Sequence, residues 1–69
     1  MKTTSYKVTF LNEKGDFEGF ETFNRLEADL KVSECVKNNF SGYLEEIIKI
    51  RNNEFPQCNK TNKNTIKIW

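Results

Sequence analysis

The chain contains no histidine, and only two cysteines and three glycines occur among its 69 residues. Histidine is the commonest general base and the commonest metal ligand, so its absence removes the simplest routes to acid–base catalysis and to a metal site. Cys35 and Cys58 belong to no C-x-x-C pair, and Gly15, Gly19 and Gly42 are too scattered to form a phosphate-binding loop. We therefore expect no metal, no cofactor and no enzymatic activity.

Length and charge limit the remaining possibilities. A chain of 69 residues is enough for a single domain, residues 1–69, which buries only about 60% of the surface that its unfolded form exposes. We expect the aromatic and aliphatic side chains to be used up in one small core. Eleven basic and ten acidic residues leave a net charge of +1, so no overall field directs the protein to nucleic acid or membrane.

No apolar run is long enough to span a membrane, and the N-terminal segment MKTTSYKVTF lacks the apolar stretch of a signal peptide. These features predict a cytoplasmic protein without a membrane segment. In that compartment two cysteines are expected to stay reduced.

The first half of the chain predicts a β-hairpin. Residues 5–12, SYKVTFLN, alternate apolar and polar side chains and are rich in β-branched and aromatic types, as is typical of a half-buried strand. The polar segment NEKGD follows, with Gly15 able to adopt a positive φ, and then the second strand begins with FEGFETF.

The three phenylalanines of that second strand raise a question of register. An unbroken strand would place Phe17, Gly19, Glu21 and Phe23 on one face, and burying Glu21 between two rings would be costly. We expect a β-bulge at Gly19 that lets Phe17 and Phe20 both face the core. The alternative is that Phe20 stays on the surface as an aromatic anchor for another protein.

A helix is predicted to begin at Arg25. Asn24 can cap its N-terminus, Glu27 stands at the capping-box position, and Phe23 is placed to pack as a hydrophobic staple against Ala28.

The predicted apolar side of this helix follows from helical spacing. Leu26, Leu30, Val36 and Phe40 share one broad arc with Val32 at its edge, while polar side chains gather opposite. We expect that arc to face the core.

The second half of the chain is less decisive. The segment YLEEIIKIRNN, residues 43–53, fits a capped helix or a strand built on its three isoleucines. We favour the strand, because TIKIW at residues 65–69 alternates clearly and needs a partner. The expected fold is a small α+β domain of β-β-α-β-β order with one helix on an antiparallel sheet. The alternative is a hairpin, two helices and a C-terminal strand.

Charge along the chain suggests where a partner would bind. Residues 13–34 hold seven acids and three bases, so this stretch could meet a basic surface on another protein. We expect Asp16, Glu18, Phe20 and Glu21 to contact that partner. The predicted function is a small non-enzymatic protein-binding module. Its small size, its lack of motifs and the nine lysines and nine asparagines that indicate an AT-rich gene lead us, by elimination, to expect an inhibitor or adaptor encoded by a bacteriophage or mobile element and acting on a host protein.

The alternative function is weak nucleic-acid binding. Residues 56–69 hold three lysines and no acid, so Lys60, Lys63 and Lys67 could contact phosphates while Trp69 stacks on a base. A homodimer paired through the sheet edge that TIKIW would form is a further possibility.

Overall fold

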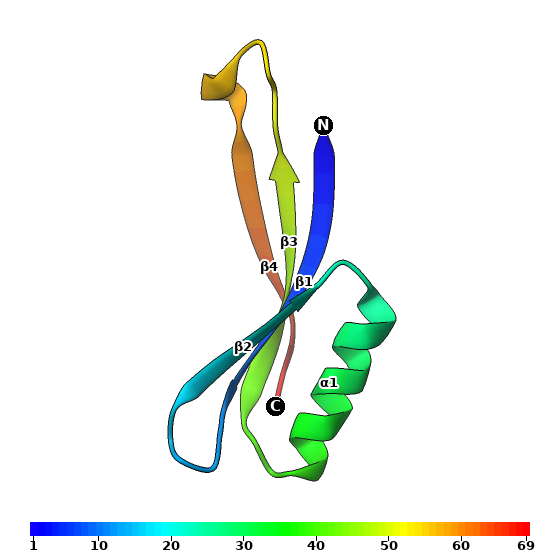
Figure 1. Ribbon diagram of the computed structural model, residues 1–69, viewed down its shortest axis with the longest axis vertical. Coiled ribbons are helices and arrows are strands. Elements are labelled where there is room, and N and C mark those ends of the chain that lie inside the picture. The colour runs from blue at the N-terminus through cyan, green and yellow to red at the C-terminus, as the bar shows by residue number, and fades with distance from the viewer.

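Four antiparallel strands and one long helix make up the structure, a computed structural model that describes residues 1–69 (Figure 1). The elements are β1 (Lys2–Leu11), β2 (Phe17–Thr22), α1 (Arg25–Lys37), β3 (Gly42–Ile50) and β4 (Lys60–Ile68), with a short 3₁₀ helix at Pro56–Cys58 before β4. The sheet order is β2-β1-β3-β4. The predicted α+β fold and its β-β-α-β-β order are confirmed, including the choice of a strand in the segment 43–53.

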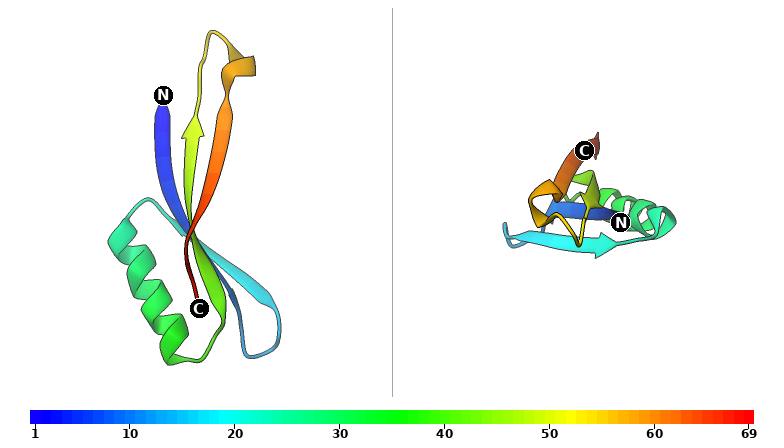
Figure 2. Two further views of the ribbon diagram at one scale, coloured as in Figure 1. Left: turned by 180° about the vertical axis from the view of Figure 1, so that it is seen from behind. Right: turned by 90° about the horizontal axis from the view of Figure 1, so that it is seen from above.

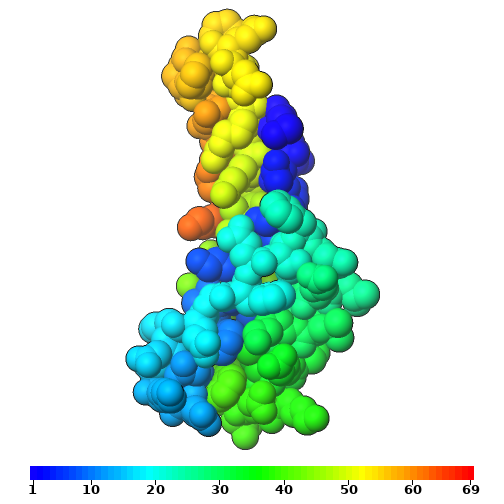
Figure 3. Space-filling view, in the orientation of Figure 1, coloured from blue at the N-terminus to red at the C-terminus, as the bar shows by residue number.

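The helix covers only part of the sheet. It packs against β1, β2 and, less extensively, β3, at the end of the sheet that carries the β1–β2 hairpin (Figures 1 and 2). The β3–β4 end and the start of β1 project beyond it, which makes the molecule elongated, with extents of 46 × 23 × 14 Å. Figure 3 shows the result as a broad end built on the hairpin and α1, and a narrow end built on the β3–β4 connection.

The β1–β2 turn forms as the sequence predicts. Gly15 has a φ of +82°, a value that glycine adopts without the steric cost of a side chain. The Asn12 side-chain oxygen accepts hydrogen bonds from the backbone N–H groups of Lys14 at 2.9 Å and Asp16 at 3.0 Å. These bonds hold the polar turn in place and set the register of the two strands.

The expected bulge at Gly19 is wrong. β2 pairs with β1 in an uninterrupted register, with Phe20 opposite Val8, and Phe17 is 74% exposed. Strict alternation therefore places Phe17, Gly19 and Glu21 on one face, and that face is turned away from the helix. Because Glu21 is not buried there, no bulge is needed to keep its charge in water.

The N-terminus of α1 is capped by Asn24, as predicted. The Asn24 Oδ1 accepts a hydrogen bond from the Leu26 N–H at 2.9 Å. Glu27 supports the cap through Thr22 instead of bonding to Asn24 directly. Its carboxylate accepts a hydrogen bond from the Thr22 hydroxyl at 2.7 Å, and the same hydroxyl oxygen accepts one from the Asn24 N–H at 3.1 Å. The hydrophobic staple is wrong, because the Phe23 ring is 75% exposed.

The predicted inner face of α1 is also wrong. Ala28, Val32 and Cys35 are the helix residues that are buried in the core, whereas Leu26 and Leu30 are 67% and 64% exposed. Val36 is likewise exposed, at 50%. Of the arc expected to face inward, Val32 is buried and Phe40, which follows the helix, packs at the margin of the core.

The rotation of the helix has a steric reason. The sheet supplies the large side chains of the core, Phe10 and Leu44, together with the partly buried Phe20. Small residues on the helix, Ala28 and Cys35, let the two layers approach closely, and close packing of a small core requires such complementarity of volume. Leucines in the same positions would hold the helix away from the sheet.

The C-terminal residue closes one end of the core. Trp69 donates its indole N–H to the carbonyl oxygen of Phe40 at 2.8 Å, and the Phe40 ring stacks on Phe10 with centroids 5.8 Å apart. Trp69 and Gly42 also exchange two backbone hydrogen bonds of 3.0 Å. The last residue is thereby tied to both the sheet and the segment that follows α1.

The one α-helix, 13 residues long, falls short of the length and apolar character that crossing a bilayer requires.

Candidate protein interface

More large apolar side chains lie on the surface than in the core. The core contains seven buried hydrophobic residues, so the expectation that the core would use up the apolar side chains is wrong. The exposed large hydrophobic residues are Met1, Leu11, Phe17, Phe23, Leu26, Leu30, Val36, Tyr43, Ile50, Phe55, Ile66 and Ile68. A small chain cannot bury all its apolar side chains, so only those that lie next to one another on the surface are informative about binding.

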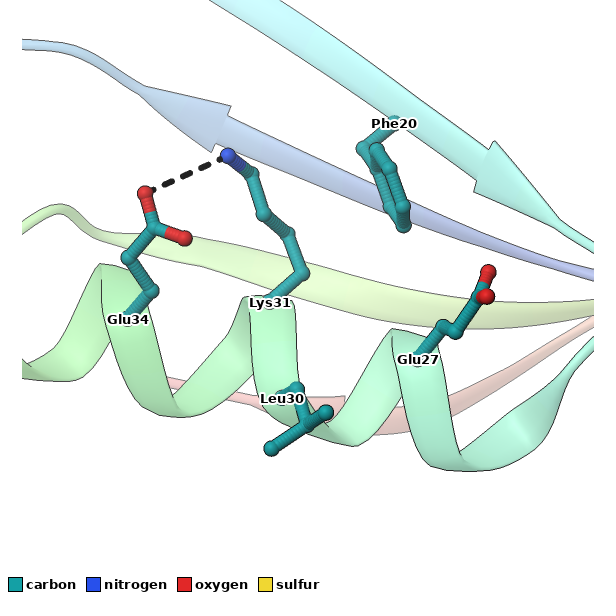
Figure 4. Close-up of a pocket in the computed structure, with 5 residues that line it drawn as sticks. All are labelled: Phe20, Glu27, Leu30, Lys31 and Glu34. Atoms are coloured by element: carbon teal, nitrogen blue, oxygen red, sulfur yellow. Dashed lines mark hydrogen bonds and ion pairs between the residues drawn. The ribbon is translucent and has the colours of Figure 1, made fainter.

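An open groove runs between β2 and α1 (Figure 4). It has a volume of about 420 Å³ and is lined by Phe20 from the strand and by Glu27, Leu30, Lys31 and Glu34 from the helix. Figure 4 shows the Phe20 ring directed from the strand toward the helix, and Leu30 directed away from the sheet. The groove therefore has an apolar part and a charged part.

Lys31 is the cation among the residues that line this groove, beside two glutamates. Its Nζ lies 3.5 Å from the Glu34 Oε1 and 5.2 and 5.8 Å from the ring centroids of Phe10 and Phe20. A cation above two aromatic rings is attracted by the negative face of each ring. Lys31 is thus held by its own protein. One carboxylate oxygen of Glu27 accepts from Thr22 and one of Glu34 pairs with Lys31, so the second oxygen of each remains available at the groove.

Exposed leucines lie on the outer side of α1, and one of them, Leu30, also lines the groove. We call Leu26 and Leu30, together with Phe23 just before the helix, the α1 stripe; Phe23, Leu26 and Leu30 are 75%, 67% and 64% exposed. Leu26 and Leu30 are one helical turn apart, so their side chains are neighbours on the helix surface. Sequence reasoning identified these leucines as apolar but assigned them to the core.

The predicted partner-binding residues do not share one surface. Glu18 and Phe20 lie on the helix side of β2, Glu21 lies on the opposite face, and Asp16 lies in the hairpin turn. Glu18 accepts a hydrogen bond from the Asn12 side chain at 3.0 Å. Glu21 accepts one from the Ser5 hydroxyl at 3.1 Å. Phe20 is half-buried and packs against the core, so its ring belongs to the groove wall rather than to a protruding anchor.

The residues of the alternative nucleic-acid site are also divided. β4 is exposed along all nine residues and forms the sheet edge, as expected. Lys63 lies opposite Ile47, while Lys60 and Lys67 pair with residues on the other face of β3. The Trp69 indole is engaged with Phe40 and packs against the core, so it is not presented for stacking.

The two cysteines are both free and differ in environment. Cys35 is buried in the core, and desolvation raises the pKa of its thiol, an effect that Lys31 partly opposes and that Glu34 and Glu18 reinforce. Cys58 is exposed in the 3₁₀ helix. The structure gathers no group of three or more side chains that could hold a metal ion.

No protein-family model, no curated protein and no solved structure matches this chain.

Proposed function

We propose that this protein is a small, non-enzymatic protein-binding module that docks a partner on the α1 stripe and the adjoining groove. The observation that carries the proposal is the orientation of α1. The helix buries Ala28, Val32 and Cys35 and presents Leu26 and Leu30 to solvent. Leaving two leucines in water forgoes about 1.5–3 kcal/mol for each side chain relative to full burial, which a partner could recover by covering them.

The chemistry of the partner follows from the charges beside the stripe. Glu27 and Glu34 lie on the groove, and Lys31 is engaged with Glu34 and two aromatic rings. Glu18 and Asp16 add negative charge on β2 and its turn. A partner segment with apolar side chains flanked by lysine or arginine would complement this surface in both shape and sign.

The biological role that best suits such a module is that of an inhibitor or adaptor, encoded by a bacteriophage or mobile element, that binds a host protein. Its support is the small size, the AT-rich codon usage implied by nine lysines and nine asparagines, and a surface that offers binding rather than a reaction. The role predicts that binding alone, without turnover, is enough to alter the partner's activity.

An affinity capture with a tagged protein in lysate of the cells that carry the gene tests the proposal. The wild type is expected to retain one protein stoichiometrically, and the double substitution Leu26→Gln/Leu30→Gln is expected to release it. Lys63→Gln is the matched control, because this residue lies on β4 away from the stripe. If the wild type retains no protein, or if the double variant retains the same protein equally well, the proposed function is wrong.

A second candidate function, weak nucleic-acid binding, is favoured by one observation. β4 presents Lys60, Lys63 and Lys67 on a fully exposed edge strand that has no acidic residue. Phosphate contacts by three lysines would give an affinity that falls steeply as salt is raised. A titration of a fluorescent oligonucleotide at low and moderate salt tests it, and no binding at low salt would remove this candidate.

A further inference from the structure

The face of the sheet opposite α1 carries a second apolar surface. Side chains on this face are those that alternate with the buried Val8, Phe10 and Leu44. At the hairpin end they include Leu11 and Phe17, which pair across β1 and β2, and Tyr43 and Ile68, which pair across β3 and β4. Figure 2 shows α1 on one side of this end of the sheet and no element over the other side.

These four residues form one continuous patch. Tyr43 is the cross-strand partner of Thr9, so it lies diagonally beside Leu11, at a Cα separation of about 7–8 Å. We call Leu11, Phe17, Tyr43 and Ile68 the open-face patch. Phe17 and Ile68 are 74% and 77% exposed, and Leu11 and Tyr43 are each 37% exposed. An antiparallel sheet with one solvated face normally turns polar side chains to that face.

The charge around the open-face patch is negative. The next row of side chains toward the middle of the sheet is Glu21, Lys7 and Glu45, aligned across three strands. On the other side of the patch, the hairpin turn supplies Glu13, Lys14 and Asp16. Lys7 extends over Gly19, whose position leaves room for it. Four carboxylates and two amines surround the patch.

We propose that the open-face patch binds an amphipathic helix of a partner protein whose apolar stripe is flanked by basic residues. The size of the patch favours a helix. Four strands spaced about 4.8 Å apart span about 14 Å, close to the 10–12 Å diameter of a helix with its side chains. The 13 residues of α1 cover the other side of the same end of the sheet, so a helix of similar length suits this side.

The charges favour this occupant over two others. A second copy of the chain would bring the same acidic surroundings against each other, which costs energy. Single-stranded nucleic acid could stack on Phe17 and Tyr43, but its phosphates would meet the carboxylates of Glu21 and Glu45. A basic helix covers the same rings and is attracted by the same carboxylates.

This site lies on the opposite face of the sheet from the groove and consists of different apolar residues. Its test is therefore independent of the test of the proposed function. Occupied together, the two surfaces would let one small domain connect two partner segments.

The test is a titration of the ¹⁵N-labelled full chain followed by amide chemical shifts. The probe is a synthetic amphipathic helical peptide of about 14 residues, close to four turns, with a leucine stripe and flanking lysines. We expect its addition to shift the amides of the open-face patch. We expect Phe17→Ser and Ile68→Ser, each tested singly, to weaken binding by at least about tenfold, as truncation of a central contact does. Both residues are exposed, and the spectrum of each free variant checks its fold.

Three controls make the result specific. Leu26→Gln/Leu30→Gln should leave the peptide-induced shifts of the open-face patch unchanged, because these residues lie on α1. The same peptide with glutamate in place of each lysine should bind at least about tenfold more weakly. An oligo-dT of about ten nucleotides should cause no shift at the patch.

The proposal is overturned by shifts that map to α1 instead of the patch, by equal affinity for the two peptides, or by the absence of any shift. Oligonucleotide binding at the patch would overturn it in favour of nucleic acid. Patch signals that broaden with protein concentration alone would overturn it in favour of a second copy of the chain.

Discussion

The indole N–H of Trp69 donates a hydrogen bond to the carbonyl oxygen of Phe40 at 2.8 Å, joining the last residue of the chain to the segment after the helix. Both residues pack against the core from its margin. The bond satisfies the part-buried indole N–H and carbonyl groups at once, and the Trp69 ring packs against the end of the core. The stability of the domain should therefore depend on its last side chain.

We expect Trp69→Phe to lower the free energy of unfolding by about 1–3 kcal/mol, because the Phe40 carbonyl loses its partner. Urea denaturation followed by circular dichroism measures the change. Ile68→Ala is the matched control: its side chain is 77% exposed, so it should change stability by no more than about 0.5 kcal/mol. Equal effects of the two substitutions would contradict the role assigned to Trp69.

The orientation of α1 predicts that substituting the smaller Val32, which is buried, costs more stability than substituting the larger Leu30, which is exposed. Val32→Ala should cost about 1.5–3 kcal/mol, because it removes buried methyl groups and leaves a cavity. Leu30→Gln should cost no more than about 0.5 kcal/mol, since glutamine is a comparable helix former and the site is exposed. Thermal and urea unfolding of both variants measure this. A larger loss for Leu30→Gln than for Val32→Ala would show that the leucines face the core.

Gly42 is predicted to be irreplaceable for a steric reason. A Cβ at this position would collide with the backbone oxygen of Thr9 and would lie 2.8 Å from the Phe10 Cα. Because neither backbone atom can move without disturbing the β1–β3 pairing, Gly42→Ala should cost about 3 kcal/mol.

Gly19→Ala is the control for this substitution. A Cβ there would meet the Lys7 Cε at 3.2 Å, and a flexible side chain can move aside. We expect its stability to stay within about 1 kcal/mol of the wild type. Urea midpoints of the two alanine variants compare them directly, and a similar midpoint for both would refute the steric explanation.

The cap of α1 should contribute measurably to stability. Asn24→Ala removes the side-chain oxygen that accepts from the Leu26 N–H, and we expect a loss of about 1 kcal/mol. Asn24→Asp should retain the stability, since a carboxylate can accept the same bond and is favoured at the positive end of a helix. Chemical denaturation of both variants, with the helical signal recorded, tests this; a loss in the aspartate variant equal to that in the alanine variant would argue against capping.

The two thiols should differ in reactivity. Burial raises the pKa of the Cys35 thiol, so at neutral pH it is both protonated and inaccessible, whereas Cys58 is exposed. We expect a disulfide reagent to modify one thiol in the folded protein and two in denaturant, with Cys58→Ser abolishing the native-state reaction.

The same shift gives a pH dependence of stability. A thiol whose pKa is raised in the folded state binds its proton more tightly there than in the unfolded chain. Its contribution to stability is therefore complete below the ordinary thiol pKa and is lost as the pH rises through the raised value. Unfolding free energies of the wild type and Cys35→Ala across the alkaline range should converge as pH rises, and parallel curves would count against the burial effect.

Local patterns in the sequence were enough to predict the elements and their order. Alternation predicted β1, the polar segment with Gly15 predicted the hairpin turn, and Asn24 predicted the start of α1. Each of these features depends on residues that are close together in the sequence, so each element can be predicted from its own segment. The strand choice at residues 43–53 rested on a pairing argument, in which TIKIW needed a partner, and β3 and β4 do pair.

Which side of each element faces the core was a different matter, and only the tertiary structure decided it. The sequence allowed Phe17 and Leu30 to point inward because their hydrophobicity favours burial. In the fold, Phe10, Phe20 and Leu44 already fill the space beneath the helix, so only small side chains such as Ala28 and Cys35 fit against them. The core of a 69-residue chain cannot bury all its large side chains, because the volume enclosed by one helix and one sheet face is limited. Part of the remainder lies on the two surfaces to which we assign binding.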